Sequence, residues 1–575
     1  MLADLDLALK QPLQLIEKLF AEGGSTLDGF ELRVQQAFES LLHDARDQLP
    51  AITSLTERSR LPPAGSLVRF RAMVQDTGYG TELYRALGAR DQLLMYGIDE
   101  TDEGNQASAH EDYSKLKERQ VFYVVSPPGE TSWVKEALDG HSGQALESAL
   151  SNLSLSSGAP PSSHSAPTSL PNKVPLPFEP HFGMIAKIYT DLGDKLRSTD
   201  VLEFVGILGE TPLSNAFDVF EHSEDAAPPQ VVPALHVLYA LPSPTSIPVS
   251  FTSEPAEFET IRRELIGYLA HNGLGGDLEA AEWVLLSLIA RIHTRHASGL
   301  ALGALSLNLA FPPQSTPSAS TAALSTVLSS LVPSLAPLSP TITSLNDPAT
   351  RFSPRSRDES LDSGMLQLPR GTNVVVDLTN LGEGKLNDTG VRNLRSLSTT
   401  ISQQKLVYEF PFSSFELETD LGFLVLSEGK AIVPTDCVLY VEAASARTDA
   451  EYQPPAPTEE ALKRFRSLIQ SAKHSEFSIP LEMSDVIQSD FVARRQASHS
   501  GGAGGAMTQE DLLFRMTVSR LMALSHGKRQ LDEQSWLETA ELDERRKERV
   551  PLVVRQKQQQ QEAEAGGQQR RKGQA

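Results

Sequence analysis

The chain has 575 residues, 40% of them apolar, and its 74 acidic and 51 basic residues leave a formal net charge of −23. This length predicts about two to four domains, and the acidic balance argues against nucleic-acid binding by bulk electrostatics, because phosphate contacts need a basic surface. The single cysteine, Cys437, excludes an internal disulfide and a cysteine zinc cluster, and we find no signal-peptide pattern or membrane-spanning apolar run, so we expect a soluble intracellular protein.

Residues 1–137 are predicted to form helices followed by a small β unit. Apolar residues recur at helical spacing over 2–20 and 28–43. The period changes to two over Leu67–Val74, and 120–125 repeats that alternation before a Pro-Pro-Gly turn. We expect these strands to form a barrel-like, OB-like unit, a fold that often binds single-stranded nucleic acid.

That precedent leaves single-stranded-DNA binding through 66–136 open as an alternative function. The residues that would form a basic, aromatic groove are Arg69, Phe70, Arg71, Tyr123 and Trp133. Acidic residues crowd 99–118, and the packing of a barrel explains the same aromatic residues, so the sequence favours the packed barrel.

A linker and a second β region follow. Residues 138–177 are mainly Ser, Pro, Ala and Gly, and we predict a disordered linker because they cannot bury enough apolar surface to fold. A second β region is expected over 178–250. Apolar periodicity then predicts helices over 255–271 and 278–295.

Residues 311–360 are rich in Ser, Thr and Pro, but apolar residues of 324–332 have helical spacing, so we expect a helix inside a flexible insert. Ser353 precedes a proline within the basic stretch Arg351–Arg357, which is the pattern that proline-directed kinases prefer. Ser353 is therefore a candidate phosphorylation site, although such short motifs are common.

The stretch 364–410 gives the clearest signal of a site. Its predicted strands and helix are 365–368, 373–378, 389–402 (the helix) and 405–410. The apolar run 374–376 indicates a central parallel strand, because both faces of such a strand are covered. In P-loop ATPases a carboxylate in the position of Asp377 holds Mg²⁺ and a following acid helps to activate water. Here the next residue is Leu378, so the site has the outline of an ATPase without its acid pair.

The C-terminal third is predicted to be mostly helical. Two further strands are expected at 422–426 and 437–441, with Cys437 in the core. Helices are expected over 455–545, and the Gln-rich tail 546–575 is predicted to be disordered. Nuclear import could read the basic clusters 545–547 and 570–572, although acids intervene.

Six segments together resemble the mini-chromosome maintenance (MCM) complex-binding protein family of eukaryotes. They are SLVRFRAMVQD (66–76), FYVVSPPGETSWVKEA (122–137), DLEAAEWVLLSLIARIHTR (277–295), SGMLQLPRGTNVVVDLTNL (363–381), LSEGKAIVPTDC (426–437) and MTQEDLLFRMTVSRLMALSHG (507–527). The resemblance implies a nuclear, non-catalytic protein that binds MCM helicase subunits. It also implies a role in their assembly, protection or unloading from chromatin, and so in DNA replication and sister-chromatid cohesion.

The resemblance further implies a decayed copy of the ATPase module of MCM subunits. A P-loop cradles phosphate with backbone N–H groups and neutralises it with a Lys. Segment 276–283 is similar to the P-loop of MCM subunits, with Glu282 in the place of that Lys and Trp283 in the place of the Mg²⁺-binding hydroxyl. Glu279 replaces the second glycine, which blocks the backbone approach.

Two other positions have changed in the same direction. Leu378 replaces the acid that would follow Asp377. Glu510 stands where MCM subunits carry an Arg that would touch the γ-phosphate. We therefore expect no ATP hydrolysis, and nucleotide binding remains only an alternative.

Ordinary structural roles explain several of these residues equally well. Asp277 would cap the following helix, Trp283 is more typical of a core, and Asp377 would bond within its loop. His293 and His296 have a spacing that metal sites use, but no acid or thiol of defined spacing accompanies them, so we predict no metal site.

We therefore predict a mixed α/β protein: N-terminal helices with an OB-like β region, then an inactive AAA+/MCM-like α/β domain with a helical C-terminal lid. The predicted parts are 1–137, the linker 138–177, a second β region 178–250, the AAA+-like domain 251–454 with its flexible insert 311–360, the lid-like region 455–545 and the tail 546–575. We expect no catalytic residue and no cofactor. The expected partners are MCM subunits, with chromatin reached indirectly.

Overall fold

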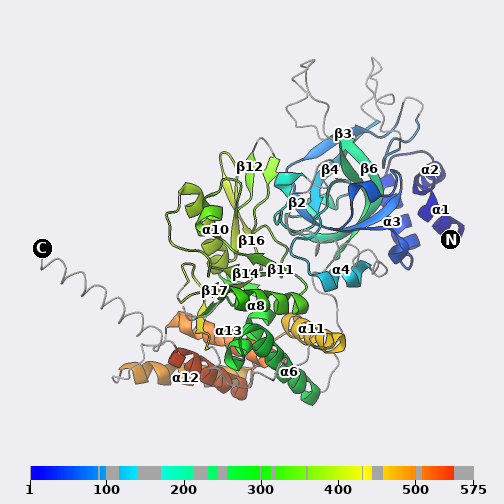
Figure 1. The fold of residues 1–575 in the computed structure, drawn as a ribbon. Coiled ribbons are helices and arrows are strands. Elements are labelled where there is room, and N and C mark those ends of the chain that lie inside the picture. Colours follow the sequence, from blue (N-terminus) through cyan, green and yellow to red (C-terminus); the bar gives the residue numbers. More distant parts are fainter. Residues whose placement is uncertain are drawn as a thin grey trace, which may run out of the picture. The chain divides into compact units, whose positions relative to one another are not determined.

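The structure is a computed structural model of the chain (Figure 1). It describes residues 2–88, 91–98, 115–139, 170–212, 231–243, 255–297, 299–311, 317–357, 360–429, 431–442, 457–499 and 508–549. The chain forms two compact units, each collected from separate stretches of sequence. Unit 1 comprises Met1–Thr245, Arg351–Arg370 and Leu406–Leu417, and unit 2 comprises Ser246–Thr350, Gly371–Lys405 and Glu418–Ala575.

Three helices open unit 1. They are α1 (Leu2–Lys10), α2 (Pro12–Glu22) and α3 (Phe30–Leu42). The helix predicted over 2–20 is therefore two helices, because Pro12 lacks an amide hydrogen and stands in the first turn of α2. Ile16, Phe30 and Phe38 are fully buried and share one core with strand residues of the same unit.

Seven strands of unit 1 form one sheet in the order β1-β2-β6-β7-β5-β4-β3. They are β1 (Ala51–Ile52), β2 (Leu67–Asp76), β3 (Thr81–Arg85), β4 (Leu116–Val125), β5 (Gly183–Ile188), β6 (Val201–Pro212) and β7 (Val231–Pro242). Strand β2 pairs with β4 as well as with β6, so β2, β6, β7, β5 and β4 close into a barrel. Phe70, Phe122 and Phe204 belong to one buried cluster of this barrel. The barrel-like unit expected from the alternating sequence is thus present.

The two β regions that the sequence separates, however, belong to this one sheet. Strand β4 pairs with β5 and β2 pairs with β6, on opposite sides of the predicted linker 138–177. The prediction of a separate second β region over 178–250 is therefore corrected, because its strands belong to the same sheet as β2 and β4. A barrel buries its inner face only when it closes, and the alternating pattern identifies strands but not their partners.

A second sheet of unit 1 has the order β13-β12-β15-β16. Its strands are β12 (Arg355–Arg357), β13 (Ser360–Asp362), β15 (Lys405–Glu409) and β16 (Ser414–Glu418). Buried polar groups hold it: Lys173 pairs with Asp76, whose carboxylate also accepts from the backbone of β13. The strand expected over 365–368 is instead a turn, where the fully buried Gln367 donates to the backbone oxygen of Gln75 at 2.8 Å.

Unit 2 contains a five-stranded sheet in the order β11-β14-β17-β10-β18, with every pair parallel. Its strands are β10 (Leu307–Ala310), β11 (Leu335–Leu338), β14 (Asn373–Asp377), β17 (Gly422–Ser427) and β18 (Cys437–Tyr440). All five residues of β14 are buried, as expected for a strand with both faces covered. The central parallel strand predicted from the run 374–376 is confirmed.

Residues 311–360 are not simply a flexible insert. They contain the predicted helix, α8 (Pro317–Leu331), and they also supply β11, which pairs with β14. Pro337 lies within β11, which ends the strand order, and an edge strand tolerates the missing amide hydrogen of proline. The proline-rich composition therefore concealed a strand of the sheet.

Helices cover both faces of this sheet. The main helices of unit 2 are α6 (Pro255–Gly273), α7 (Leu278–Ile289), α8, α10 (Asp388–Gln403), α11 (Glu459–His474), α12 (Leu481–His499), α13 (Gln509–Ser525) and a helix over 533–549, and α12 packs in a separate cluster with the last of these. Helices α6, α7, α8, α11 and α13 share one large core with the sheet, and α10 lies on the opposite side in Figure 1. Residues 546–549 are helical, so the disorder predicted from 546 is wrong for these residues, and 550–575 lie outside the part of the chain that the structure describes.

The remaining short elements complete both units. They are α4 (Ser132–Asp139), α9 (Ile342–Asn346), β8 (Thr294–Arg295), β9 (Ala301–Leu302) and 3-10 turns at Arg46–Gln48, Arg58–Arg60, Pro171–Lys173 and Gly193–Lys195. Helix α7 ends at Ile289, so the helix predicted over 278–295 is too long and does not include His293. Among the helices that the structure describes, none is long and apolar enough to cross a membrane.

Candidate functional site

Segment 276–283, which resembles a P-loop in sequence, begins in the connection between helices α6 and α7 and continues through the first half of α7. A P-loop instead joins a strand to a helix, so this segment lacks the backbone context of one. Asp277 is the N-cap of α7, and its Oδ1 accepts from the amide of Ala280 at 3.0 Å. The capping role predicted for Asp277 is confirmed.

The N-terminus of α7 is occupied by charged side chains of the chain itself. Arg549 donates to Asp277 at 2.8 Å and pairs with Glu279 at 3.1 Å, and the backbone amide of Glu442 donates to Asp277 at 3.0 Å. Burial raises the pKa of the Glu279 carboxyl, while Arg549 and Arg545 oppose that rise. A phosphate would have to displace the Asp277 and Glu279 carboxylates from Arg549, so the N-terminus of α7 is unfavourable for anion binding.

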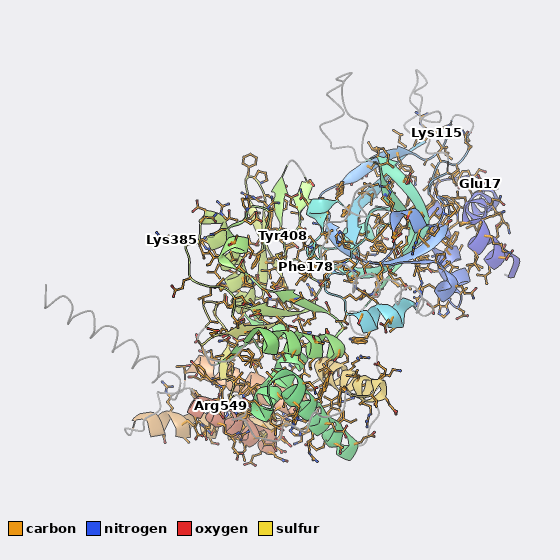
Figure 2. All side chains as sticks on the ribbon, in the orientation of Figure 1. Glu17, Lys115, Phe178, Lys385, Tyr408 and Arg549 are labelled. Atoms are coloured by element: carbon orange, nitrogen blue, oxygen red, sulfur yellow. The ribbon has the colours of Figure 1, made fainter. Side chains whose placement is uncertain are left out.

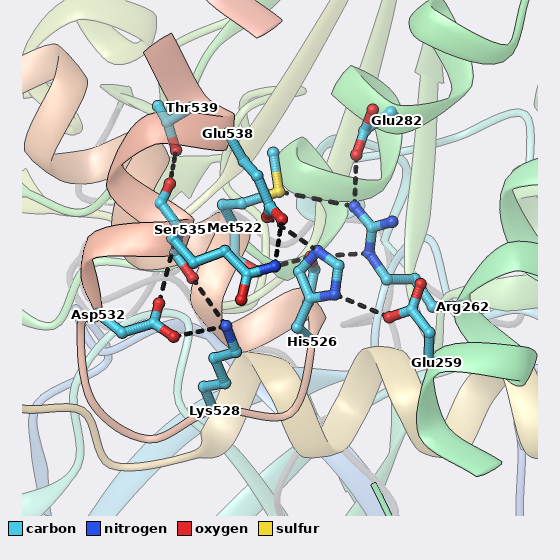
Figure 3. A network of polar contacts seen from close by, with 12 residues as sticks. Glu259, Arg262, Glu282, Met522, His526, Lys528, Asp532, Ser535, Glu538 and Thr539 are labelled. Carbon is cyan, nitrogen blue, oxygen red and sulfur yellow. Dashed lines mark hydrogen bonds and ion pairs between the residues drawn. The ribbon is translucent and has the colours of Figure 1, made fainter. Parts of the chain in front are cut away.

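Glu282 and Trp283, the two replaced P-loop positions, join α7 to neighbouring helices. Figure 3 shows Glu282 paired with Arg262 of α6, whose Nε also donates to Ser525 at 3.0 Å. Trp283 is fully buried and stacks on Phe514 at 6.3 Å between ring centroids. Both residues therefore act as packing and tethering groups.

The same network continues to the loop after α13. His526 Nδ1 lies 2.8 Å from Glu259 of α6, and its Nε2 lies 3.6 Å from Glu538 (Figure 3). Lys528 pairs with Asp532 at 2.6 Å within the same loop. This network fixes the C-terminal helices on α6.

Asp377 ends strand β14, as the sequence predicted, and lies at the carboxyl ends of parallel strands. Its Oδ1 accepts from the amide of Thr379 at 3.0 Å and from the Thr379 hydroxyl at 2.6 Å. It borders a cavity of about 200 Å³. The other residues that line this cavity are Thr321, Ala322, Ser325, Pro337, Ser339, Val375 and Asn380. Leu378 is buried and its amide donates to the Leu426 oxygen at 2.8 Å, which extends the pairing with β17.

The strand–loop–helix arrangement that a P-loop requires occurs where β10 leads into α8. It does not occur at segment 276–283, which precedes β10. The chain leaves Ala310, passes through residues 311–316 and enters α8. That stretch reads Phe-Pro-Pro-Gln-Ser-Thr and contains neither glycine nor lysine. Residues 312–316 lie outside the described part, but their composition alone lacks the groups that cradle phosphate.

Glu510 is exposed in the first turn of α13, one turn before Phe514. Thr508 caps that helix by accepting from the Asp511 amide at 3.1 Å. Stacking of Phe514 on Trp283 brings the starts of α13 and α7 together. Among the contacts described for Trp283 and for Asp377, no partner is shared, so the predicted positions fall into two separate places.

The sequence profile of the mini-chromosome maintenance replisome factor family matches residues 38–157 and 141–550 of this chain. The chain belongs to this family. Its relatives include the mini-chromosome maintenance complex-binding proteins of Danio rerio, 29% identical over 93% of this chain and 96% of the relative, and of Homo sapiens, 27% identical over 94% and 97%. The Arabidopsis thaliana protein of the same name is 28% identical over 88% of this chain and 91% of its own length.

In this member of the replisome factor family, two of the residues predicted for a single-strand groove are buried, two form ion pairs, and Trp133 is only partly buried. Arg69 pairs with Glu203 at 3.1 Å, and Arg71 pairs with Glu130. Phe70 and Tyr123 are 0% and 1% exposed. Base stacking on the two buried rings would require the barrel to open, and a phosphate backbone would have to displace Glu203 and Glu130 from the two arginines.

Other candidate residues have similarly ordinary surroundings. Within the described ranges, no three His, Cys, Asp or Glu side chains are placed to hold a metal ion. Ser353 is 8% exposed, so a kinase would reach it only after local opening. Burial raises the pKa of the Cys437 thiol to about 12. Two residues of the basic cluster 545–547, Arg546 and Lys547, form ion pairs with Asp543 of the same unit.

One feature of this family member was missed from the sequence: a group of exposed aromatic residues between β15 and β16. Phe412 and Phe415 are 102% and 57% exposed. The signal was available in the sequence as Phe-Pro-Phe-Ser-Ser-Phe at 410–415. The strand prediction ended at 410 and so stopped at the start of this group.

Proposed function

We propose that this chain binds subunits of the MCM helicase complex and catalyses no reaction. The observation that carries the proposal is family membership over nearly the whole chain, with relatives that are named MCM complex-binding proteins. The binding would act in the assembly or protection of MCM complexes, or in their unloading from chromatin, during DNA replication and sister-chromatid cohesion. It would take place in the nucleus.

The proposal includes an AAA+-like origin for the sheet of unit 2. Numbered along the chain, its parallel strands have the order 5-1-4-3-2 from β18 to β11, with the first strand in the interior of the sheet, as in open α/β sheets that bind ligands at the strand ends. Asp377 then occupies the carboxyl end of the third strand, where P-loop ATPases hold Mg²⁺. The closed five-stranded barrel of unit 1 likewise supports an OB-like assignment, because that fold is a five-stranded barrel.

Loss of ATP chemistry follows from the same alignment of strands. The residues after the first strand lack glycine and lysine, and Leu378 replaces the acid after Asp377. A module without nucleotide chemistry still presents the surfaces by which ring subunits pack. We propose that the chain occupies the place of a neighbouring subunit and so delays ring closure.

The test is capture of each purified MCM subunit separately by the full-length chain, with and without ATP. Capture of one or a few subunits, equal with and without ATP, is the expected result. Fluorescent ATP and a labelled single-stranded oligonucleotide, titrated into the same preparation, serve as controls for the two alternative functions. Failure to capture any subunit, together with saturable ATP or oligonucleotide binding, would reject the proposal.

A further inference from the structure

Strands β15 and β16 form a hairpin, which we call the aromatic hairpin and define as residues 405–418. The turn is closed by the Phe410 amide, which donates to the Ser413 oxygen at 2.8 Å. The base of the hairpin is fixed in unit 1, because the Tyr408 ring is buried and its hydroxyl lies 2.9 Å from the Ser198 hydroxyl (Figure 2). Strand β12 pairs with β15 on the other side. The hairpin is thus a supported element with an exposed tip.

The tip exposes four large apolar side chains. Phe412 is 102% exposed, the highest fraction among large apolar residues in the described part of the chain, and Phe415 is 57% exposed. Phe410 and Leu417 are each 38% exposed. Phe410 and Phe415 touch edge to face at 5.6 Å between ring centroids. Single exposed apolar residues need no explanation, but a contiguous group of this kind marks an interaction surface.

Strand β16 adds a second observation. It ends the strand order of its sheet, and each of its five residues is exposed. An edge strand presents unpaired backbone groups, which another chain can use to add a strand. Side chains alternate along a strand, so Phe415 and Leu417 share one face while Glu416 and Glu418 share the other. An added strand would meet apolar groups on one face and carboxylates on the other.

The charges around the aromatic hairpin indicate the chemistry of the occupant. Strands β15 and β16 carry Glu409, Glu416 and Glu418 against Lys405, within a chain of net charge −23. Glu409 pairs with Arg355 at 3.5 Å and Glu418 pairs with Arg295 at 3.3 Å, so carboxylates of the hairpin already bind basic side chains. A second copy of the chain would carry the same net charge of −23, and repulsion between like charges opposes its association. An extended segment with Lys or Arg alternating with apolar residues complements both faces.

We propose that the aromatic hairpin is a docking surface on which an extended, basic and apolar segment of an MCM subunit adds a strand to β16. Phe412 and Phe415 would provide the apolar contacts, and Glu416 would face the basic side chains. The inference rests on the proposed function and specifies the surface that carries it out.

The experiment compares full-length variants in binding to the MCM subunit that the unmodified chain captures. We expect the double variant Phe412→Ser with Phe415→Ser to weaken binding by about tenfold or more, because aromatic anchors dominate interface energetics. Phe178→Ser is the matched control, since Phe178 is 56% exposed and lies outside the hairpin. Glu416→Lys should also weaken binding while leaving the aromatic group intact. Circular dichroism of each variant checks the fold.

Hydrogen exchange of the complex tests strand addition directly. Backbone amides of β16 should gain protection when the subunit binds, and amides of the control region around Phe178 should not. Equal binding by the unmodified chain and the double variant, or no added protection in β16, would overturn the inference while leaving the proposed function standing. Capture of no subunit by the unmodified chain would overturn both.

Light scattering of the chain alone tests whether a second copy of the chain, rather than an MCM segment, occupies the hairpin. A dimer that dissociates in the double variant would assign the hairpin to a second copy of the chain and would also overturn the inference. A monomer in both forms is the expected result.

Discussion

At the residue scale, the positions that resemble a decayed ATP site have definite structural work in this chain. Asp277 caps α7 and binds Arg549, Glu282 binds Arg262, and Trp283 lies in the core. A carboxylate on a helix N-terminus is stabilised by the free N–H groups and by the helix dipole. The residues that exclude phosphate are therefore also residues that hold unit 2 together.

The substitution Asp277→Ala should lower the free energy of unfolding by about 2–4 kcal/mol. It removes the cap of α7 and one carboxylate from the half-buried Arg549 guanidinium. Urea denaturation followed by circular dichroism measures the loss. Asp277→Asn is the matched control, because asparagine keeps the cap but loses the charge, and it should cost less. Equal losses in both variants would show that capping contributes little.

Cys437 should resist alkylation in the native chain. Burial raises the pKa of its thiol from its ordinary value to about 12, so the reactive thiolate is scarce in the native chain at pH 8. Intact mass after iodoacetamide treatment should show no adduct until denaturant is added. Rapid labelling of the native chain would place Cys437 at an accessible site instead.

The same thiol gives a pH dependence of stability. The pKa of the Cys437 thiol is raised in the folded chain. The stabilisation that the neutral thiol gives to the folded state is therefore fully present below about pH 9 and is lost as the pH rises toward about 12. We expect the free energy of unfolding to fall over that window, and to fall less in Cys437→Ala. The comparison of the two urea titrations isolates the thiol from tyrosines that ionise in the same range.

At the scale of elements, the strands were easier to identify than their partners. The alternating run of β2 and the apolar run of β14 were both predicted, because each pattern reports which faces are covered. Pairing of β4 with β5 and of β2 with β6 was not predicted, since no local signal links segments that lie so far apart in the sequence. Strand β11 was missed because Pro337 is typical of non-strand sequence except at an edge.

Cleavage between residues 138 and 170 should therefore leave unit 1 assembled. We expect a chain with a protease site inserted at position 155 to elute as one species after cleavage, because strands from both fragments pair in one barrel. Size-exclusion chromatography measures this, and the fragments should separate in guanidinium chloride. Separation in native buffer would mean that the two β regions fold apart.

At the scale of the whole molecule, two features bear on partner binding: the net charge of −23 and the assembly of each unit from separate stretches of sequence. Unit 1 takes 351–370 and 406–417 from the middle of the chain, so the chain passes repeatedly between the units. Deletions that treat the chain as consecutive domains would remove strands from both. Binding experiments on this protein therefore need the full chain.

The acidic balance predicts that association with a basic MCM segment slows as salt rises. Raising ionic strength from about 0.05 M to about 0.5 M shortens the screening length several-fold and should lower the association rate constant several-fold. Stopped-flow fluorescence at each salt concentration measures it, and Glu416→Lys should reduce the slope. An association rate that stays constant with salt would remove charge complementarity as an argument for the occupant.

The sequence by itself determined the family, most helices, the central strand and the absence of a complete phosphate-binding set, because each depends on local pattern or residue identity. Tertiary structure decided that one barrel spans the linker and that 311–360 supplies an edge strand. It also placed the P-loop-like segment between two helices, and it left Phe412 and Phe415 exposed. Each of these features depends on which distant parts of the chain come into contact. The sequence alone does not show whether an apolar residue is covered by such contacts or left exposed to water.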